Sequence, residues 1–314
     1  MTVSPDVRPR SEDTDEIDLV PMDSLTAEHT GRWTFLILDG AAFMMQAMHP
    51  VIAEVTGRYS ASFNGDPGGR AIRSMDSVLR WTYGLHEAVA EGNRVRALHK
   101  PITMTSAHTG KQISALDKEA YQWVIATGYL VTEQAGRLSM GRPFTEAERA
   151  ELLRDNRRLA RLLHTPMRGY PVTHEEMTAF YERMITERLE GTPQAKQLIE
   201  ELRTGKVDLG PSVPKALVPL ILPALRPFAR FGYLSIIGLL DPRLREKLGV
   251  TWSSAEEREL VRIYKVVRTA YRVLPDRLTY FPLAYHARKH HQCLRKMEQR
   301  QQKSFAYNLP AARN

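Results

Sequence analysis

The hydrophobic positions of this chain follow helical periodicity, and the segment from Trp33 to Met48 is apolar on nearly every side, with Asp39 and Gln46 as exceptions. Such all-round hydrophobicity is typical of a helix buried inside a protein. The segment is too short and too interrupted to span a bilayer, and Pro50 ends or kinks it. We therefore predict a buried central helix over residues 33–48.

Capping residues and prolines mark the other predicted helices. Asp66 and Pro67 supply an N-cap and a first-turn proline for a helix that ends near Tyr83. Capping-box patterns begin at Thr145 and at Ser253, and the helix after Ser253 ends at Leu274-Pro275. Further helices are predicted over residues 87–100, 118–134 after Asp117, 173–191 and from 193 onward. We find no β alternation and no repeat, so the expected fold is all-α, a single globular bundle of roughly ten helices.

The segment from Ala216 to Leu240 is long and apolar but is interrupted by three prolines, Pro219, Pro223 and Pro227. It also contains Arg226 and Arg230, and two arginines near the bilayer centre are costly. We expect a buried helix pair or the wall of a pocket here, and no transmembrane span.

Charge is distributed unevenly along the 314 residues, whose net charge is +8. The segment before Gly31 is acidic, whereas the segment from His286 to Lys303 is basic. We divide the chain into a flexible acidic arm (1–30), a helical domain (31–285) and a basic tail (286–314). A basic tail can bind nucleic acid or anionic lipid. We favour a solvated helix end or an arm packed on an acidic neighbour, for which the N-terminal segment is a candidate, and expect no nucleic-acid partner.

Composition and missing motifs narrow the class of protein. A hydrophobic share of 43% provides a substantial core, and the single cysteine, Cys293, excludes an internal disulfide and fits a reducing compartment. Without a visible signal peptide, we expect a cytoplasmic protein. The chain has no glycine-rich phosphate loop, CxxC, HExxH or GxSxG motif. Ordinary nucleotide-binding, zinc-hydrolase and serine-hydrolase signatures are therefore absent.

His99 is the leading candidate for a metal ligand. It ends a predicted helix two residues before Pro101, one turn after Val95. One imidazole nitrogen there can coordinate a metal while a backbone carbonyl holds the other N–H. The alternative is a histidine that is simply favoured by the negative end of the helix dipole.

Several short motifs occur in an order that resembles the MpaB-type and latex-clearing (rubber oxygenase) superfamily. The matching segments cover about residues 30–280: Gln46-Ala-Met-His49-Pro50, Asp66-Pro67-Gly-Gly-Arg70 with Ser74, Arg94 to His99, Ser114 to Asp117 with Trp123, Leu239 to Arg245, Leu248 to Ser253, and Leu274-Pro275. Each motif alone is weak, but the ordered set is fairly specific.

The resemblance implies a helical bundle that encloses a haem b (iron) pocket. His99 matches the family's proximal ligand, and Arg70 matches an arginine placed near the haem. Ser74 stands where the family usually has threonine and retains the hydroxyl. Arg73 matches a position where the latex-clearing branch carries a lysine on the distal side.

Two further residues are candidates at this site. His49 is either a distal histidine or a buried structural one hydrogen-bonded to the backbone, and we favour the structural role. Glu54 matches a glutamate thought to remove an allylic proton in the latex-clearing branch, although an exposed helical glutamate is the alternative. Tyr59, Ile113 and Ile125 replace polar or aromatic groups common in the family, which leaves the substrate open.

We expect a haem-dependent oxygenase or oxidase that acts on an apolar or natural-product-like small molecule with molecular oxygen or peroxide. Two alternatives remain: a haem-binding carrier or sensor without turnover, and a helical interaction protein without haem. The substrate, the sixth haem ligand and the oligomeric state, with a homo-oligomer possible, stay open at this point.

Overall fold

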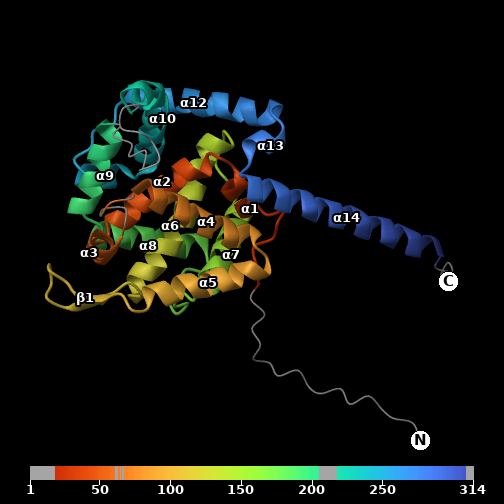
Figure 1. The fold of residues 1–314 in the computed structure, drawn as a ribbon, viewed down its shortest axis with the longest axis horizontal. Helices are drawn as coiled ribbons and strands as arrows, with labels where there is room; N and C mark the ends of the chain where they lie inside the picture. Colours follow the sequence, from red (N-terminus) through yellow and green to blue (C-terminus); the bar gives the residue numbers. More distant parts are fainter. Residues whose placement is uncertain (1–17, 61–62, 64, 66, 205–217, 309–314) are drawn as a thin grey trace, which may run out of the picture.

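The computed structural model describes residues 18–60, 63, 65, 67–204 and 218–308, and this part of the chain is predominantly α-helical (Figure 1). It contains fourteen α-helices, one π-helical turn and two short strands. In chain order they are α1 (Leu25–Gly31), α2 (Phe35–Ala47), α3 (Pro50–Tyr59), α4 (Pro67–Tyr83), α5 (His86–His99), β1 (Thr103–Thr105), β2 (Gln112–Ser114), α6 (Lys118–Ser139), α7 (Glu146–Leu162), α8 (His174–Arg183), η1 (Met184–Arg188), α9 (Pro193–Thr204), α10 (Val218–Leu239), α11 (Pro242–Lys247), α12 (Ser254–Val273), α13 (Asp276–Thr279) and α14 (Pro282–Asn308).

The predicted central helix is confirmed as α2. Met44, Met45 and Met48 at its C-terminal end are buried, and α2 packs against α3, α6, α9 and α10 (Figure 1). An unbranched thioether fills irregular gaps between helices, which suits methionine to a helix contacted on several sides. Elements from both halves of the sequence therefore share one core around α2.

The predicted caps form as the sequence indicates. Asp117 accepts a hydrogen bond from the backbone N–H of Ala120 at 3.0 Å, and both capping boxes, at Thr145 and at Ser253, are complete. Each cap satisfies backbone donors that the first helical turn leaves free. The α4 helix begins at Pro67 as expected, while its predicted N-cap, Asp66, lies outside the described residues.

Three elements differ from the prediction. A small antiparallel hairpin, β1 with β2, pairs Thr103 with Ser114, although no β structure was expected. Its strands have three residues each, too few to show an alternating pattern. Pro50 both ends α2 and begins the unpredicted α3. Of the two alternatives for residues 216–240, the helix pair is wrong because α10 is one helix, whereas residues 238–240 at its C-terminal end do line a cleft.

The N-terminal segment also differs from the expected flexible arm over residues 18–30. Val20, Met22 and Ala27 are buried, and α1 packs against α4 and α7. Residues 1–17 lie outside the described part of the chain.

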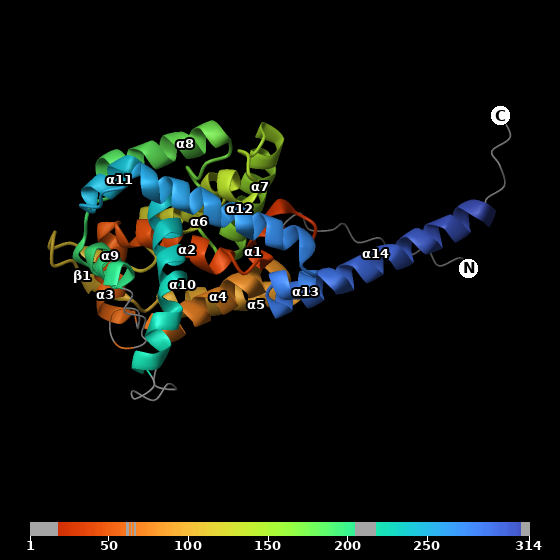
Figure 2. The ribbon, with the colours of Figure 1, turned by 90° about the horizontal axis from the view of Figure 1, so that it is seen from above.

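The basic tail belongs to α14, which crosses the expected boundary at residue 286 without a break. Its first turn is buried at Ala284, and its later turns project away from the helical body (Figures 1 and 2). Arg288 donates to the Met22 carbonyl at 3.2 Å, and Arg295 pairs with Asp23. The basic segment thus packs partly against acidic N-terminal residues.

Within the described residues, no single helix has the length and hydropathy needed to cross a membrane. The pair α2 and α3 would satisfy both criteria together, but the chain bends by 107° between them.

Candidate functional site

The α4 and α5 helices form a hairpin that brings the predicted arginine and histidine positions to the same end. Only Gly84 and Leu85 connect the packed helices, so they run antiparallel. Ser77 donates to the buried Glu91 at 2.5 Å, and extending this pairing places position 70 opposite position 98. The first turns of α4 therefore lie beside the last turn of α5.

Glu91 holds the two helices together. Its carboxylate accepts hydrogen bonds from Arg94 at 2.5 and 2.7 Å and lies 3.6 Å from the Arg80 guanidinium. The hydrogen bond from Arg94, with help from Ser77, keeps the pKa of Glu91 below its usual value in spite of desolvation. An ionised buried carboxylate is tolerated only with such partners, so this cluster fixes the register of the hairpin.

His99 is held in a defined orientation at the end of α5. Its Nδ1 lies 2.7 Å from the carbonyl oxygen of Val95, one helical turn earlier. A carbonyl only accepts, so Nδ1 carries a proton, and among the two neutral tautomers this contact selects the one with the lone pair on Nε2. The half-buried ring meets the Tyr121 ring edge-on, with centroids 6.5 Å apart. In the part of the chain that the structure describes, Nε2 has no hydrogen-bond partner.

Arg70 and Ser74 contact each other along α4. The Arg70 Nη1 donates to the Ser74 hydroxyl, as their spacing of four residues allows. Burial lowers the pKa of the half-buried Arg70, the neighbouring Arg73 lowers it further, and Asp39 opposes both. Arg73 itself is exposed.

Asp39 is the acid that faces Arg70. Burial on the apolar α2 helix raises its pKa to about 6, and the nearby Arg70 charge limits this rise. An acid and an arginine thus interact where α2 approaches α4, although neither is fully exposed to solvent.

Glu54 lies on α3, where its carboxylate is already engaged. One oxygen accepts from the Ser106 hydroxyl at 2.6 Å, and the other accepts from the Ala107 N–H at 2.8 Å. Glu54 therefore ties α3 to the turn between β1 and β2.

His49 lies at the N-cap of α3 and is 3% exposed. Neither ring nitrogen has a hydrogen-bond partner among the described residues, so the backbone hydrogen bond expected for a structural histidine is not observed. The nearest carboxylate oxygen, on Glu119, is 4.0 Å from Nε2, beyond hydrogen-bonding distance. Desolvation lowers the pKa of His49, and Glu119 opposes this only in part, so the ring is neutral near pH 7.

The two histidines approach α6 from different sides. His49 faces Glu119 and His99 faces Tyr121, which are two positions apart in the helix. Two positions correspond to about 200° around an α-helix. The structure therefore does not present the two rings as a pair of ligands for one metal.

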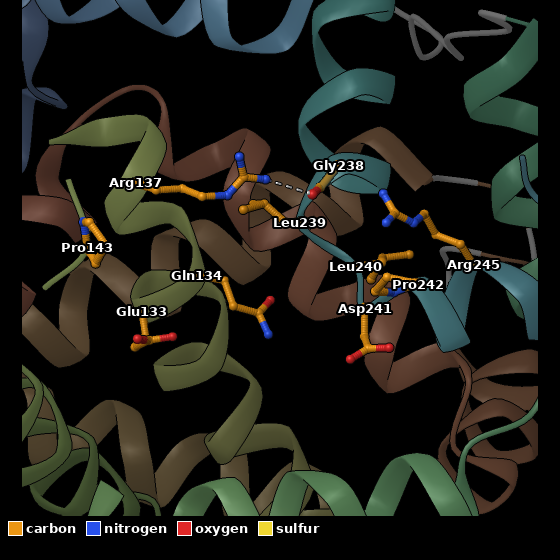
Figure 3. A pocket seen from close by; sticks show the side chains of 10 residues that line it. All are labelled: Glu133, Gln134, Arg137, Pro143, Gly238, Leu239, Leu240, Asp241, Pro242 and Arg245. Atoms are coloured by element: carbon orange, nitrogen blue, oxygen red, sulfur yellow. Dashed lines mark hydrogen bonds between the residues drawn. The ribbon is translucent and has the colours of Figure 1, made fainter. Parts of the chain in front are cut away.

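Two open clefts lie elsewhere on the molecule. The first has a volume of about 360 Å³ and is lined by residues of α6, α10 and α11, among them Gln134, Arg137 and Asp241 (Figure 3). Arg137 reaches across it to the Gly238 carbonyl at 3.4 Å. The second, of about 470 Å³, adjoins it through Arg245. Neither cleft is lined by a predicted site residue, so these clefts lie apart from the residues that carry the predicted chemistry.

The comparison with known protein families decides the class. Residues 27–269 match the family described as "ER-bound oxygenase mpaB/B'/Rubber oxygenase, catalytic domain". The chain belongs to this family. The match runs from α1 into α12 and includes all the predicted site residues. As a member of a family of oxygenase catalytic domains, the chain is an oxidoreductase of the oxygenase class that uses oxygen and a small-molecule substrate. No curated protein and no solved structure matches it.

Within this oxygenase domain, the residues that contact Arg70, His99 and Glu54 were not identified from the sequence. Asp39 could have been found, because it is the lone acid in an apolar helix. No sequence pattern marked Tyr121 or Ser106 as site residues, because their contacts with His99 and Glu54 join segments that are separated in the chain.

Proposed function

We propose that this oxygenase-family chain is a haem b-dependent enzyme with His99 as the iron ligand. The observation that carries the proposal is the hydrogen bond from His99 Nδ1 to the Val95 carbonyl, which leaves Nε2 with a free lone pair. A ligating histidine characteristically donates its other N–H to a carbonyl or carboxylate, which fixes the tautomer and the ring orientation. The family resemblance supports the same residue.

The residues present fit a haem. Among the described residues, no group of three or more His, Cys, Asp or Glu side chains could hold a bare metal ion. A haem iron needs only one or two protein ligands, because the macrocycle supplies the others. His99 provides one imidazole nitrogen, and Arg70 lies at the same end of the α4–α5 hairpin. When bound, haem supplies the redox chemistry that activates oxygen or peroxide.

In this proposal Arg70 is the catalytic cation. Its guanidinium offers hydrogen-bond donors to a haem carboxylate or to negative charge that develops on a reacting oxygen. Ser74 orients Arg70 through their hydrogen bond, and Asp39 balances its charge. Arg73, which is exposed, adds positive charge to the same turn.

We keep Glu54 as a candidate general base and His49 as a structural residue. To accept a proton, Glu54 would have to weaken its bond to Ser106 or Ala107. His49 is neutral and buried, and it lies on the other side of α6 from His99.

The substrate class that we propose is an apolar or natural-product-like small molecule. The positions where family members often have polar groups, such as Ile113 and Ile125, are hydrophobic here and half-buried. Fewer polar side chains at these positions favour a less polar substrate.

The test separates haem binding from turnover. Arg70→Ala should keep most of the haem and lose oxygen uptake with apolar substrates by about 100-fold, the effect expected when one stabilising donor is removed. Arg203→Ala is the control: this exposed arginine of α9 pairs with Glu200 at 2.9 Å and contacts no residue of the proposed site. Unchanged turnover in Arg70→Ala, or an equal loss in the control, would contradict the role given to Arg70. A haem protein in which no oxidant drives substrate consumption would be a carrier or sensor.

A further inference from the structure

The solvent-facing side of α12 combines positive charge with exposed valines. Arg258, Arg262, Lys265 and Arg272 are all exposed, and so are Val261, Val266 and Val273. At about 100° per residue, these seven positions fall within an arc of about 140°. We call this the basic–valine face. On the opposite side of the helix, Leu260 and Tyr264 are fully buried in the core.

The valines of this face are unusually exposed for apolar side chains. Val266 is 68% exposed and Val273 is 74% exposed, which places both among the most exposed large hydrophobic residues of the described chain. Single exposed apolar residues are common on proteins. Here three exposed valines share one face of a single helix, so the apolar surface is not one isolated side chain.

The cations of the basic–valine face lack acidic partners among the described residues, while the acids of α12 are used elsewhere. Glu259 pairs with Arg230 of α10 at 2.7 Å, and Glu257 pairs with Arg137 of α6 at 2.7 Å. Both pairs fix α12 to the helices beneath it. The outward arc itself contains no aspartate or glutamate, so its positive charge is not compensated locally.

Helix α12 lies along one edge of the molecule and is accessible over its length. Figure 1 shows it at the top of the view, and Figure 2 shows it crossing the side nearest the viewer. Because its seven residues are all exposed, the basic–valine face is open to solvent along the helix.

We propose that the basic–valine face docks this protein onto an anionic lipid bilayer. Lysine and arginine are attracted to the negative headgroups, while valine side chains enter the boundary between headgroups and acyl chains. This arrangement explains why cations and aliphatic side chains share one arc without acids. The inference concerns only this surface and is independent of haem binding.

Other occupants fit the charges and side chains less well. A second copy docked face to face about a two-fold axis would bring arginines against arginines, which is unfavourable. Single-stranded nucleic acid is usually bound by aromatic side chains that stack on bases, and the basic–valine face contains no aromatic residue.

The test is sedimentation of the full chain with vesicles. We expect binding to phosphatidylcholine vesicles that contain phosphatidylserine, little binding to phosphatidylcholine alone, and weaker binding as salt screens the charges. Each cation near an anionic surface is worth a factor of about five in partitioning. The double variant Arg262→Gln/Lys265→Gln should therefore bind about 25-fold more weakly. Val266→Ser/Val273→Ser should lose the part of the binding that survives at high salt.

The matched control is Arg154→Gln/Arg161→Gln on α7, which removes the same charge from exposed positions of another helix. Circular dichroism should show that every variant is folded. The proposal is overturned if the full chain does not bind the phosphatidylserine vesicles at low salt, or if the α7 control loses binding equally. It is also overturned if duplex DNA binds the basic–valine face more tightly than the vesicles do.

Discussion

His99 and His49 lie on different sides of the first turns of α6, and their surroundings differ in a way that supports the different roles we propose for them. His99 donates Nδ1–H to Val95 at 2.7 Å and contacts the Tyr121 ring. His49 is more deeply buried, yet neither of its nitrogens has a partner among the described residues. A ligand needs one nitrogen fixed and the other free, and only His99 meets this condition.

The more deeply buried of the two histidines, His49, is thus the one whose ring nitrogens lack hydrogen-bond partners among the described residues. An unpartnered buried imidazole is destabilising, because its polar atoms lose their bonds to water and gain none in return. A hydrogen bond to the backbone instead fixes the tautomer at little cost. The predictions below test this contrast from the largest expected effect to the smallest.

Removing the ring that contacts His99 should have the largest effect on stability. Tyr121→Ala deletes a buried aromatic side chain and should lower the free energy of unfolding by about 3–5 kcal/mol. It should also weaken haem retention, since His99 loses its neighbour. Tyr121→Phe keeps the ring and loses only the 3.1 Å hydrogen bond to the Leu163 carbonyl, so a cost of about 1 kcal/mol is expected. Chemical denaturation of both variants measures the change in the free energy of unfolding. Equal haem loss in the two variants would show that the contact between the Tyr121 ring and His99 is unimportant for haem retention.

Replacing His49 by an apolar side chain should stabilise the protein. His49→Leu removes two unpartnered buried nitrogens and keeps a similar volume, so a gain of about 1 kcal/mol at pH 7 is expected. Haem content should not change. A loss of stability would indicate that His49 makes a favourable polar interaction in solution.

The free energy of unfolding should depend on pH through the protonation of His49. Burial lowers its pKa below the ordinary value of 6.5. Between that value and the folded-state pKa, the unfolded chain therefore binds a proton at His49 that the folded chain does not bind. Stability is therefore lost as the pH falls below about 6.5 toward the folded-state pKa, and it is retained above 6.5. His29, whose pKa burial also lowers, contributes in the same direction. The stability advantage of His49→Leu over wild type should widen between pH 7 and pH 5, and a constant difference would contradict the assignment.

The smallest expected effect concerns Glu54. Ser106→Ala removes one hydrogen bond to this carboxylate and should cost about 1 kcal/mol while leaving turnover intact. Glu54→Gln should cost a similar amount of stability but abolish turnover if Glu54 is the base. Equal turnover in the two variants would restrict Glu54 to anchoring the β1–β2 hairpin.

Much of the fold could be predicted from the sequence because its signals are local. Capping boxes at Thr145 and Ser253, and the apolar run over 33–48, each lie within a few turns of chain. The packing of residues 18–30 could not be predicted, because the many acidic residues of this segment are typical of a flexible arm. The contacts of Val20 and Met22 with residues distant in the sequence leave no local pattern.

The residues of the proposed site were selected from the sequence, and they stay predictions, whereas their contacts could not be predicted from the sequence. The position of His99 before Pro101 indicated its place at a helix end, and the carbonyl partner was expected. Three features depend on tertiary contacts. They are the interaction of Asp39 with Arg70, the hydrogen bond from Ser106 to Glu54, and the lack of a partner for His49 among the described residues. A single sequence holds no record of such contacts.

The most direct measurement is the visible spectrum of the purified protein with haem quantified, for wild type, His99→Ala and His49→Ala. We predict a Soret band that is retained in His49→Ala and lost in His99→Ala. Loss of the band in His49→Ala with retention in His99→Ala would reverse the ligand assignment. No band in wild type, even after reconstitution with haem, would contradict the haem-dependent function itself.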